Sequence, residues 1–129
     1  MPLHRRVPDY CVAMKFNEVT VGIPVSDLPS AKAWYQGAFD LEEPDLEPLL
    51  ELAEYNLGSF WLQLAESPDS SGAPGITVTI SVDDAAATHR DLAAKGLAVS
   101  DVQRFEGVVE FFELTDPDGN IIGFVTELT

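Results

Sequence analysis

The sequence predicts a single α+β domain made of two copies of a β-α-β-β-β unit. A nine-residue stretch occurs twice, as VTVGIPVSD at residues 19–27 and as ITVTISVDD at residues 76–84, with five identities across an offset of 57 residues. Each copy precedes a segment with helical periodicity, and apolar segments separated by turn residues follow. A chain of 129 residues suits one domain in which two half-domains share a core.

Both copies of the repeated stretch are predicted to be strands with one buried face. Apolar residues occupy every second position, as expected of a half-buried strand. They are Val19, Val21, Ile23 and Val25 in the first copy and Ile76, Val78, Ile80 and Val82 in the second. The alternate positions hold Thr20, Gly22, Pro24, Thr77, Thr79 and Ser81. A face of that composition suits the lining of a cavity better than contact with bulk solvent.

A helix is predicted after each of these strands. Asp27 and Asp84 end the repeated stretch, and Asp at such a position commonly caps the N-terminus of a helix. Apolar residues recur with a helical period in the first helix, so Trp34 and Tyr35 are expected to lie mainly in the core. The second helix is expected to end before Gly96, because glycine is favoured just beyond a helix C-terminus.

A hairpin is predicted over residues 52–66, with its turn at Gly58 and Ser59. Alternation along its second strand puts Trp61 and Gln63 on one face. The opposite face carries Phe60, Leu62 and Leu64.

The remaining strands have weaker patterns. Pro44 and Pro48 interrupt an acidic segment and imply an edge strand or a loop. In the second unit an irregular strand is expected near residues 99–105, followed by two regular strands. The sequence DPDGN at residues 116–120 separates those two strands and predicts a turn, because proline presets one backbone angle and glycine accepts a left-handed conformation.

The chain divides into an N-terminal extension and one domain. Residues 1–15 hold three of the seven basic residues and differ in composition from the rest. The domain covers residues 16–129, with the first unit at 16–66, a linker at 67–75 and the second unit at 76–129. The linker contains two prolines, two glycines and three serines, which predicts a flexible connector.

The chain is strongly acidic, with 22 acidic and seven basic residues and a formal net charge of -15. This charge repels phosphate backbones, so nucleic acid is not an expected partner, and it favours neutral or cationic ligands. The acidity can also serve simple solubility in the cytoplasm.

The apolar runs are too short to span a membrane, so no membrane partner is expected. The single cysteine, Cys11, allows no internal disulfide and favours a reducing cytoplasmic location.

Three motifs carry a resemblance to a known superfamily. They are VSDLPSAKAWYQGAFDLE at residues 25–42, VDDAAATHRDLAAKG at residues 82–96 and LTDPDGNIIGFVTE at residues 114–127. Together with the repeat, they make residues 16–129 resemble the vicinal oxygen chelate superfamily, which includes glyoxalase I, extradiol dioxygenases, fosfomycin-resistance enzymes and bleomycin-resistance proteins. The resemblance implies two βαβββ repeats that form a cupped sheet around a cavity. It implies no single activity, because this scaffold hosts isomerases, dioxygenases, transferases and non-catalytic drug sequestration.

The resemblance also implies four metal-ligand positions, one on the first and one on the last strand of each unit. In this sequence they hold Thr20, Gln63, Thr77 and Gly123. Metal-binding relatives place His, Gln or Glu there, whereas here only Gln63 is a suitable ligand. Both histidines, His4 and His89, lie elsewhere. The expectation is therefore a protein without a metal or other cofactor, and a divalent metal is the alternative.

The candidate ligand-binding residues follow from strand parity around the cavity that the resemblance implies. They are Thr20, Gly22, Tyr55, Trp61, Gln63, Thr77, Thr79, Phe111, Glu113 and Gly123. Aromatic rings, hydroxyl groups, an amide and an acid suit a planar or cationic small molecule. The same residues can equally have purely structural roles: Trp61 in a dimer interface, Gln63 in a hydrogen bond across the cavity, and Glu113 on a solvated strand face.

Three functions remain open from the sequence. The first is a metal-free protein, similar to bleomycin-resistance proteins, that sequesters a planar, hydrophobic or cationic ligand. The second is an enzyme of lyase, isomerase or dioxygenase type, with an atypical metal site or with Glu113 or Glu110 as proton shuttle. The third is a subunit whose cavity is vestigial and whose surface serves assembly. We favour the first, and a homodimer is expected because relatives pair their units edge to edge.

Overall fold

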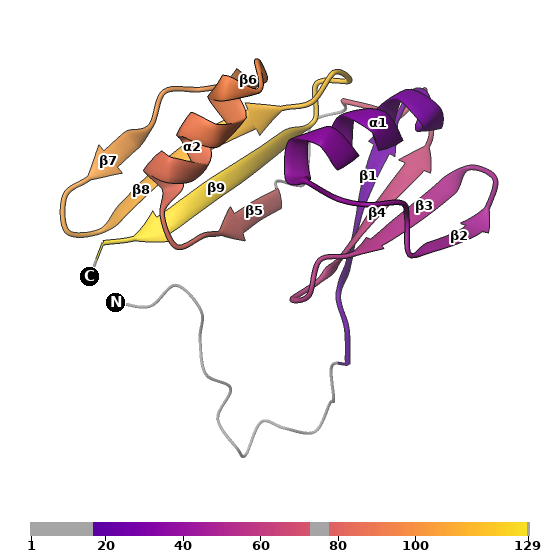
Figure 1. Cartoon of the computed structure of the whole chain (residues 1–129), viewed down its shortest axis with the longest axis horizontal. Helices are drawn as coiled ribbons and strands as arrows, with labels where there is room; N and C mark the ends of the chain where they lie inside the picture. Colours follow the sequence, from indigo (N-terminus) through magenta and orange to yellow (C-terminus); the bar gives the residue numbers. More distant parts are fainter. Residues whose placement is uncertain (1–16, 73–77, 129) are drawn as a thin grey trace.

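The computed structural model describes residues 17–72 and 78–128, which form two half-domains (Figure 1). The first half-domain contains β1 (Thr20–Val25), α1 (Leu28–Phe39), β2 (Leu46–Leu49), β3 (Leu52–Asn56) and β4 (Trp61–Glu66). The second contains β5 (Val78–Ser81), α2 (Ala85–Ala94), β6 (Ala98–Val99), β7 (Gln103–Phe105), β8 (Val109–Thr115) and β9 (Ile121–Glu127). The predicted N-terminal extension lies outside the described residues.

Both halves have the same strand topology. The first sheet has the order β1-β4-β3-β2, and the second has the order β5-β9-β8-β6, with β7 also paired to β8. β1 pairs with β4 in parallel, and β5 pairs with β9 in parallel. All other described strand pairs are antiparallel. The predicted α+β fold with two equivalent units is confirmed. One detail differs, because the irregular strand expected near residues 99–105 is two short strands, β6 and β7.

Both helices begin at the predicted caps. The carboxylate of Asp27 accepts a hydrogen bond from the N–H of Ser30 over 3.0 Å. Asp84 accepts the equivalent bond from the N–H of Ala87 over 3.0 Å. Gly96 follows α2 with a φ of 78°, as the sequence predicts for a residue just beyond the helix. No helix in the described part of the chain has the length and hydropathy that crossing a membrane requires.

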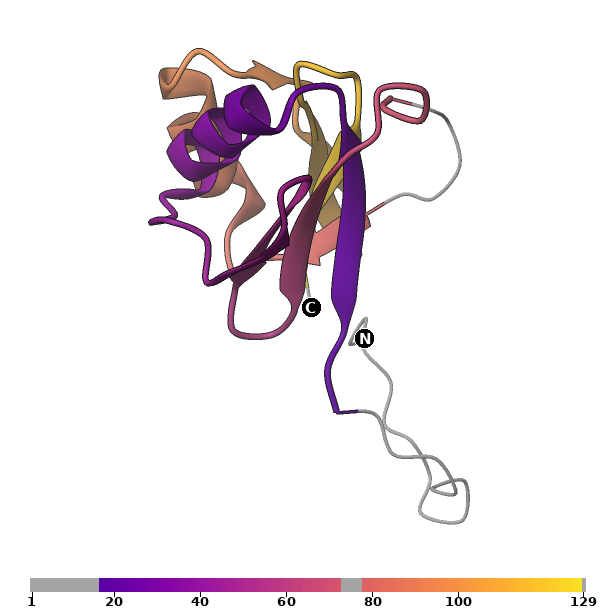
Figure 2. The ribbon, with the colours of Figure 1, turned by 90° about the vertical axis from the view of Figure 1, so that its right-hand side faces the viewer.

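Both helices cover the same side of the two sheets, as Figure 2 shows. The side chains that point toward the helices form one core across both halves, which includes Ile23, Val25, Tyr35, Leu62, Leu64, Phe112, Leu114, Ile122 and Phe124. The ring of Phe39 on α1 lies 6.2 Å from that of Phe124 on β9, edge to face. Because apolar burial is the main stabilising contribution, each half-domain depends on the other for a complete core.

A hydrogen-bonded joint at the turn between β8 and β9 connects the two halves. Asp116 is only 4% exposed, and it accepts a hydrogen bond from the hydroxyl of Tyr35 on α1 over 2.7 Å. The Asn120 amide donates to Asp116 over 2.8 Å and to the carbonyl of Pro24 on β1 over 2.9 Å. The DPDGN turn therefore reverses the chain, as predicted, and also carries the polar contact between the halves.

The described part of the linker packs against the same turn. The side-chain oxygen of Asn120 accepts a hydrogen bond from the N–H of Gly72 over 3.0 Å. A Cβ on Gly72 would overlap the carbonyl oxygen of Asp118. The φ of Gly72 is 71°, a left-handed value that glycine accepts most easily, so this position requires glycine. Residues 67–72 thus form a hydrogen-bonded turn, whereas the sequence predicted a flexible connector over the whole linker.

Lys95 makes a further contact between the halves. Its ammonium, at the end of α2, donates to the carbonyls of Gly37 and Ala38, each over 3.0 Å. It also pairs with the carboxylate of Asp40 over 3.0 Å. These acceptors lie at the C-terminus of α1, where carbonyls lack intrahelical donors and the helix dipole favours a cation. Lys95 therefore caps the helix of one half-domain from the other.

Replacing Lys95 with Met is expected to lower the free energy of unfolding by about 1 kcal/mol, because the cap is lost while the aliphatic stem remains. Urea unfolding followed by circular dichroism measures this. Arg90→Met on the same helix is the control, since Arg90 is exposed and makes no ion pair in the described region. Its effect should stay within about 0.5 kcal/mol. Equal losses in the two variants would contradict the capping role.

Candidate functional site

Eight of the ten predicted ligand-binding residues lie on the side of the sheets that the helices leave uncovered, here called the open face. It carries Thr20, Gly22, Trp61, Gln63, Thr79, Phe111, Glu113 and Gly123. Their neighbours along the strands, such as Leu62 and Phe112, point toward the helices and are buried. The strands therefore bring these residues to one face of each sheet. Ligand binding there stays a prediction, and Thr77 lies outside the described residues.

An equivalent row of three residues crosses the open face of each sheet. In the first sheet the row is Glu54 of β3, Gln63 of β4 and Gly22 of β1. In the second sheet it is Glu113 of β8, Gly123 of β9 and Thr79 of β5. Each half therefore presents one carboxylate at the same place in its row. Glu54 was not among the residues predicted for the site, because the sequence showed it only as one of many acids in its segment.

The side chain of Gln63 is held within its row. Its Nε2 donates a hydrogen bond to Oε2 of Glu54 over 2.7 Å. Its Oε1 faces β1, where a Cβ on Gly22 would come within 3.3 Å of it. Glycine at position 22 therefore leaves space for the amide. The carbonyl oxygen of Gln63 and the second N–H of its amide remain available to a ligand.

Aromatic rings stand on the open face of both sheets. Trp61 is half-buried at the start of β4. Phe111 of β8 stacks on Phe105 of β7, with ring centroids 5.9 Å apart and an angle of 3° between the planes. Phe105 is 53% exposed, so the pair presents a flat apolar surface. Phe105 was missed in the sequence because its segment lacks regular alternation, and only its pairing with β8 brings it beside Phe111.

Comparison of the sequence with models of known protein families identifies the family of this chain. The family model of the Glyoxalase/Bleomycin resistance protein/Dioxygenase superfamily matches residues 15–124. The chain belongs to this superfamily. The resemblance carried by the three sequence motifs is thereby confirmed. A comparison with curated protein sequences finds no match.

Solved structures from this superfamily have the same fold. A glyoxalase/bleomycin resistance protein from Catenulispora acidiphila DSM 44928 is 25% identical with a TM-score of 0.72, over 84% of this chain and 96% of that one. An antibiotic-binding protein from Streptomyces sp. CB03234 is 24% identical with a TM-score of 0.72, over 88% and 98%. The bleomycin-binding protein of Streptomyces verticillus, solved with copper(II)-bleomycin, is 21% identical with a TM-score of 0.69, over 86% and 96%.

The positions at which the resemblance implies metal ligands have a poor donor set in this chain. Gly123 has no side chain, and Thr20 offers only a neutral hydroxyl at an exposed site. Gln63 offers one amide oxygen, and its amide nitrogen is bonded to Glu54. Within residues 17–72 and 78–128 no three His, Cys, Asp or Glu side chains are grouped so that they could hold a metal ion. These residues do not fit a metal centre of the superfamily type.

Tyr55 does not line the open face, so its predicted placement there is wrong. It pairs with Leu62 across β3 and β4, so both side chains point into the core, where Tyr55 is 1% exposed. Its hydroxyl donates to Oε1 of Gln36 on α1 over 2.9 Å. Burial, and to a lesser extent the charges of Glu43 and Glu47, raise the pKa of Tyr55 to about 12.

The two acids considered as proton shuttles lie in different surroundings. Glu113 is on the open face and exposed, which agrees with the structural alternative of a solvated strand face. Glu110 points to the opposite side of β8 and pairs with Arg104 over 2.8 Å. General acid–base catalysis usually relies on a carboxyl group in an enclosed environment. The geometry therefore does not favour either acid in that role.

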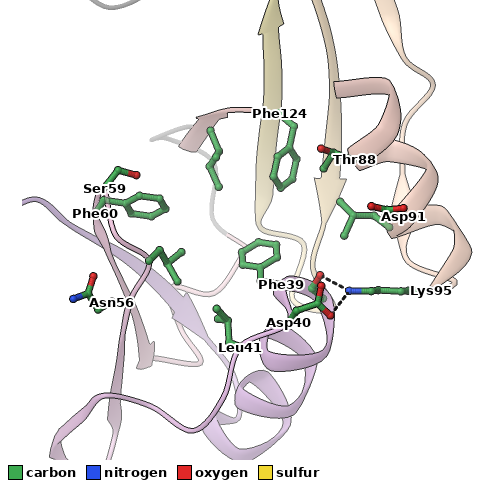
Figure 3. A pocket seen from close by; sticks show the side chains of 14 residues that line it. Phe39, Asp40, Leu41, Asn56, Ser59, Phe60, Thr88, Asp91, Lys95 and Phe124 are labelled. Carbon is green, nitrogen blue, oxygen red and sulfur yellow. Dashed lines mark hydrogen bonds and ion pairs between the residues drawn. The ribbon is translucent and has the colours of Figure 1, made fainter. Parts of the chain in front are cut away.

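A cavity of about 540 Å³ lies on the helix side, between the two half-domains (Figure 3). Its lining comes from α1, the turn between β3 and β4, β5, α2 and β9. The sequence predicted a cavity on the other side of the sheets. Strand parity gives no sign of this one, because it forms where elements from distant parts of the chain meet.

Proposed function

We propose that this protein binds a planar, apolar or cationic small molecule on its open face, without a metal ion and without chemical conversion of the ligand. The observation that carries the proposal is the poor donor set at the positions where the resemblance implies metal ligands, because among the described residues only Gln63 has a suitable side chain there. The open face nevertheless keeps groups that recognise a ligand. A binding site that has lost its metal ligands supports sequestration better than catalysis.

The chemistry of the open face supports a flat ligand with positive charge. The stacked pair of Phe105 and Phe111 offers one aromatic surface, and Trp61 offers another. Glu54 and Glu113 add a carboxylate to each sheet, and the net charge of -15 attracts cations over a longer range. Two relatives named above, an antibiotic-binding protein and a bleomycin-binding protein, agree with this class of function.

We further propose that two copies of the chain pair through the free edges of β1 and β5. Each of these strands has a described partner on one side only, β4 and β9 respectively. A free sheet edge readily pairs with another strand, and Val19 beside β1 is 57% exposed. Sedimentation equilibrium measures the assembly state. A monomer at concentrations well above those used for binding would contradict the pairing.

Replacing Trp61 with Ala is expected to weaken the binding of a planar cationic dye, proflavine, by about tenfold, because a stacking surface is lost. Isothermal titration calorimetry measures the affinity. The control is Trp34→Phe on α1, which lies on the helix side and should leave the affinity unchanged. Equal affinities for the Trp61→Ala variant and the native protein, across proflavine and a panel of similar dyes, would overturn the proposed site.

The metal-free part of the proposal has a separate test. Protein produced without a metal-binding tag is expected to contain less than about 0.1 equivalent of Zn, Ni, Mn or Fe by elemental analysis, because one amide and two hydroxyls bind such ions weakly. About one equivalent of any of these metals per chain would contradict this part. It would favour the enzymatic alternative, in which an atypical metal site acts with Glu113 on the open face.

A further inference from the structure

We propose that the cavity between the two half-domains is a second ligand site, and that it takes a small organic amine with an apolar body. It is distinct from the open face. Phe60 and Trp61 are adjacent in the chain, but Phe60 lines this cavity whereas Trp61 points to the open face. Two ligands can therefore bind on opposite sides of the first sheet.

Aromatic side chains form the apolar walls of the cavity. Phe39 of α1, Phe60 and Phe124 line it from different sides (Figure 3). Leu57 and Ile80 extend this surface. The volume of about 540 Å³ falls within the range of small-molecule sites. Phenyl rings bind an apolar body by contact area, and their faces attract a nearby cation.

Charged side chains line the cavity where α1 meets α2. Figure 3 shows Asp40, Asp91 and Lys95 together on this side. The ammonium of Lys95 is occupied by Asp40 and by two carbonyls of α1. No cation and no hydrogen-bond donor of the described residues reaches the carboxylate of Asp91. Asp91 is therefore the charge that is available to a ligand, and an ammonium group is its natural partner.

Alternative occupants fit this combination less well. An anionic ligand would meet Asp91 and Asp40 as well as the field of a chain with a net charge of -15. A neutral apolar ligand would gain nothing from Asp91, whose exposed carboxylate would stay hydrated. A second copy of this chain would bring an equally acidic surface to the same carboxylates. An amine alone satisfies both the aromatic walls and the free acid.

Dansylcadaverine is a suitable probe, because it joins an aromatic group to a primary ammonium, and N-butyl dansylamide is its neutral analogue. The fluorescence of dansylcadaverine is expected to rise on binding, with an affinity about fivefold higher than that of the analogue. Asp91→Asn should remove this difference. Phe60→Ala should weaken both probes by about tenfold, since it removes an aromatic wall. Circular dichroism and urea unfolding verify that each variant is folded.

Two matched variants distinguish binding in this cavity from binding on the open face and from a general effect of surface charge. Asp101→Asn removes an exposed acid that is not part of the cavity and should change nothing. Trp61→Ala alters the neighbour of Phe60 on the open face and is expected to weaken the probe much less than Phe60→Ala does, because Trp61 is not part of the cavity lining. The proposal is overturned if Trp61→Ala weakens the probe as much as Phe60→Ala, or if Asp91→Asn has no effect. It is also overturned if probe binding falls as the protein concentration rises, because a second copy then covers the cavity.

Discussion

Replacing Asp116 with Ala is expected to lower the free energy of unfolding by about 3 kcal/mol or more, because several buried donors lose one acceptor together. The carboxylate accepts from the hydroxyl of Tyr35 over 2.7 Å and from the amide of Asn120 over 2.8 Å. It also accepts from the backbone N–H groups of Asp118 and Asn120, over 2.9 and 2.8 Å. Urea unfolding followed by circular dichroism measures the loss.

The same turn offers a matched control for this substitution. Asp118 lies two residues from Asp116, and its carboxylate accepts a single exposed hydrogen bond from the N–H of Ser26 over 3.1 Å. Asp118→Asn is expected to change the free energy of unfolding by less than about 1 kcal/mol. If Asp116→Ala costs no more than Asp118→Asn, the buried joint does not hold the halves together.

Raising the pH above 10 is expected to unfold the protein, because two buried tyrosines resist ionisation. Burial raises the pKa of Tyr35 strongly, and the neighbouring Asp116 raises it further. The pKa of Tyr55 is raised to about 12. In the unfolded chain both hydroxyls ionise near pH 10. Their contribution to stability is therefore complete below pH 10 and is lost as the pH rises from there toward the raised pKa values.

Tyrosinate absorbance and circular dichroism, recorded in one alkaline titration, measure this effect. Tyr35 and Tyr55 are expected to ionise together with the loss of helical signal, well after the pH at which a free tyrosine titrates. In the Tyr55→Phe variant the stability should depend less steeply on pH above 10, because one group that favours the unfolded state there is absent. Ionisation of all tyrosines near pH 10 with an intact helical signal would contradict the argument.

Much of the fold was predictable because its signals are local. Alternation of apolar residues in β1 and β4 assigned each side chain to a face, and Asp27 and Asp84 marked where the helices begin. The internal repeat then required that both halves have one topology. Gly58 and its neighbours marked the hairpin between β3 and β4. These features depend on neighbours within one or two turns of chain, so residue types and spacing suffice to predict them.

The candidate site was only partly predictable. Strand alternation assigned Trp61 and Gln63 correctly to the open face. It failed for Tyr55, because the neighbouring strand β2 is irregular and the sequence did not show which face of β3 Tyr55 occupies. Phe105 was missed because β7 is too short to show a pattern. For Glu113 the sequence left a solvated strand face and a role in the site both open, since it gives the face of a residue and not what covers that face.

The sequence by itself determined the superfamily, the two equivalent units and the poor set of metal donors, because these follow from motifs and residue identities. Only the tertiary structure decided how the halves meet. The units are joined by contacts such as the hydrogen bond between Tyr35 and Asp116 and the cap that Lys95 provides to α1. The cavity around Phe39 and Asp91 is lined by residues from both units. Such contacts depend on the relative placement of two units that share one core, and no local periodicity encodes that placement.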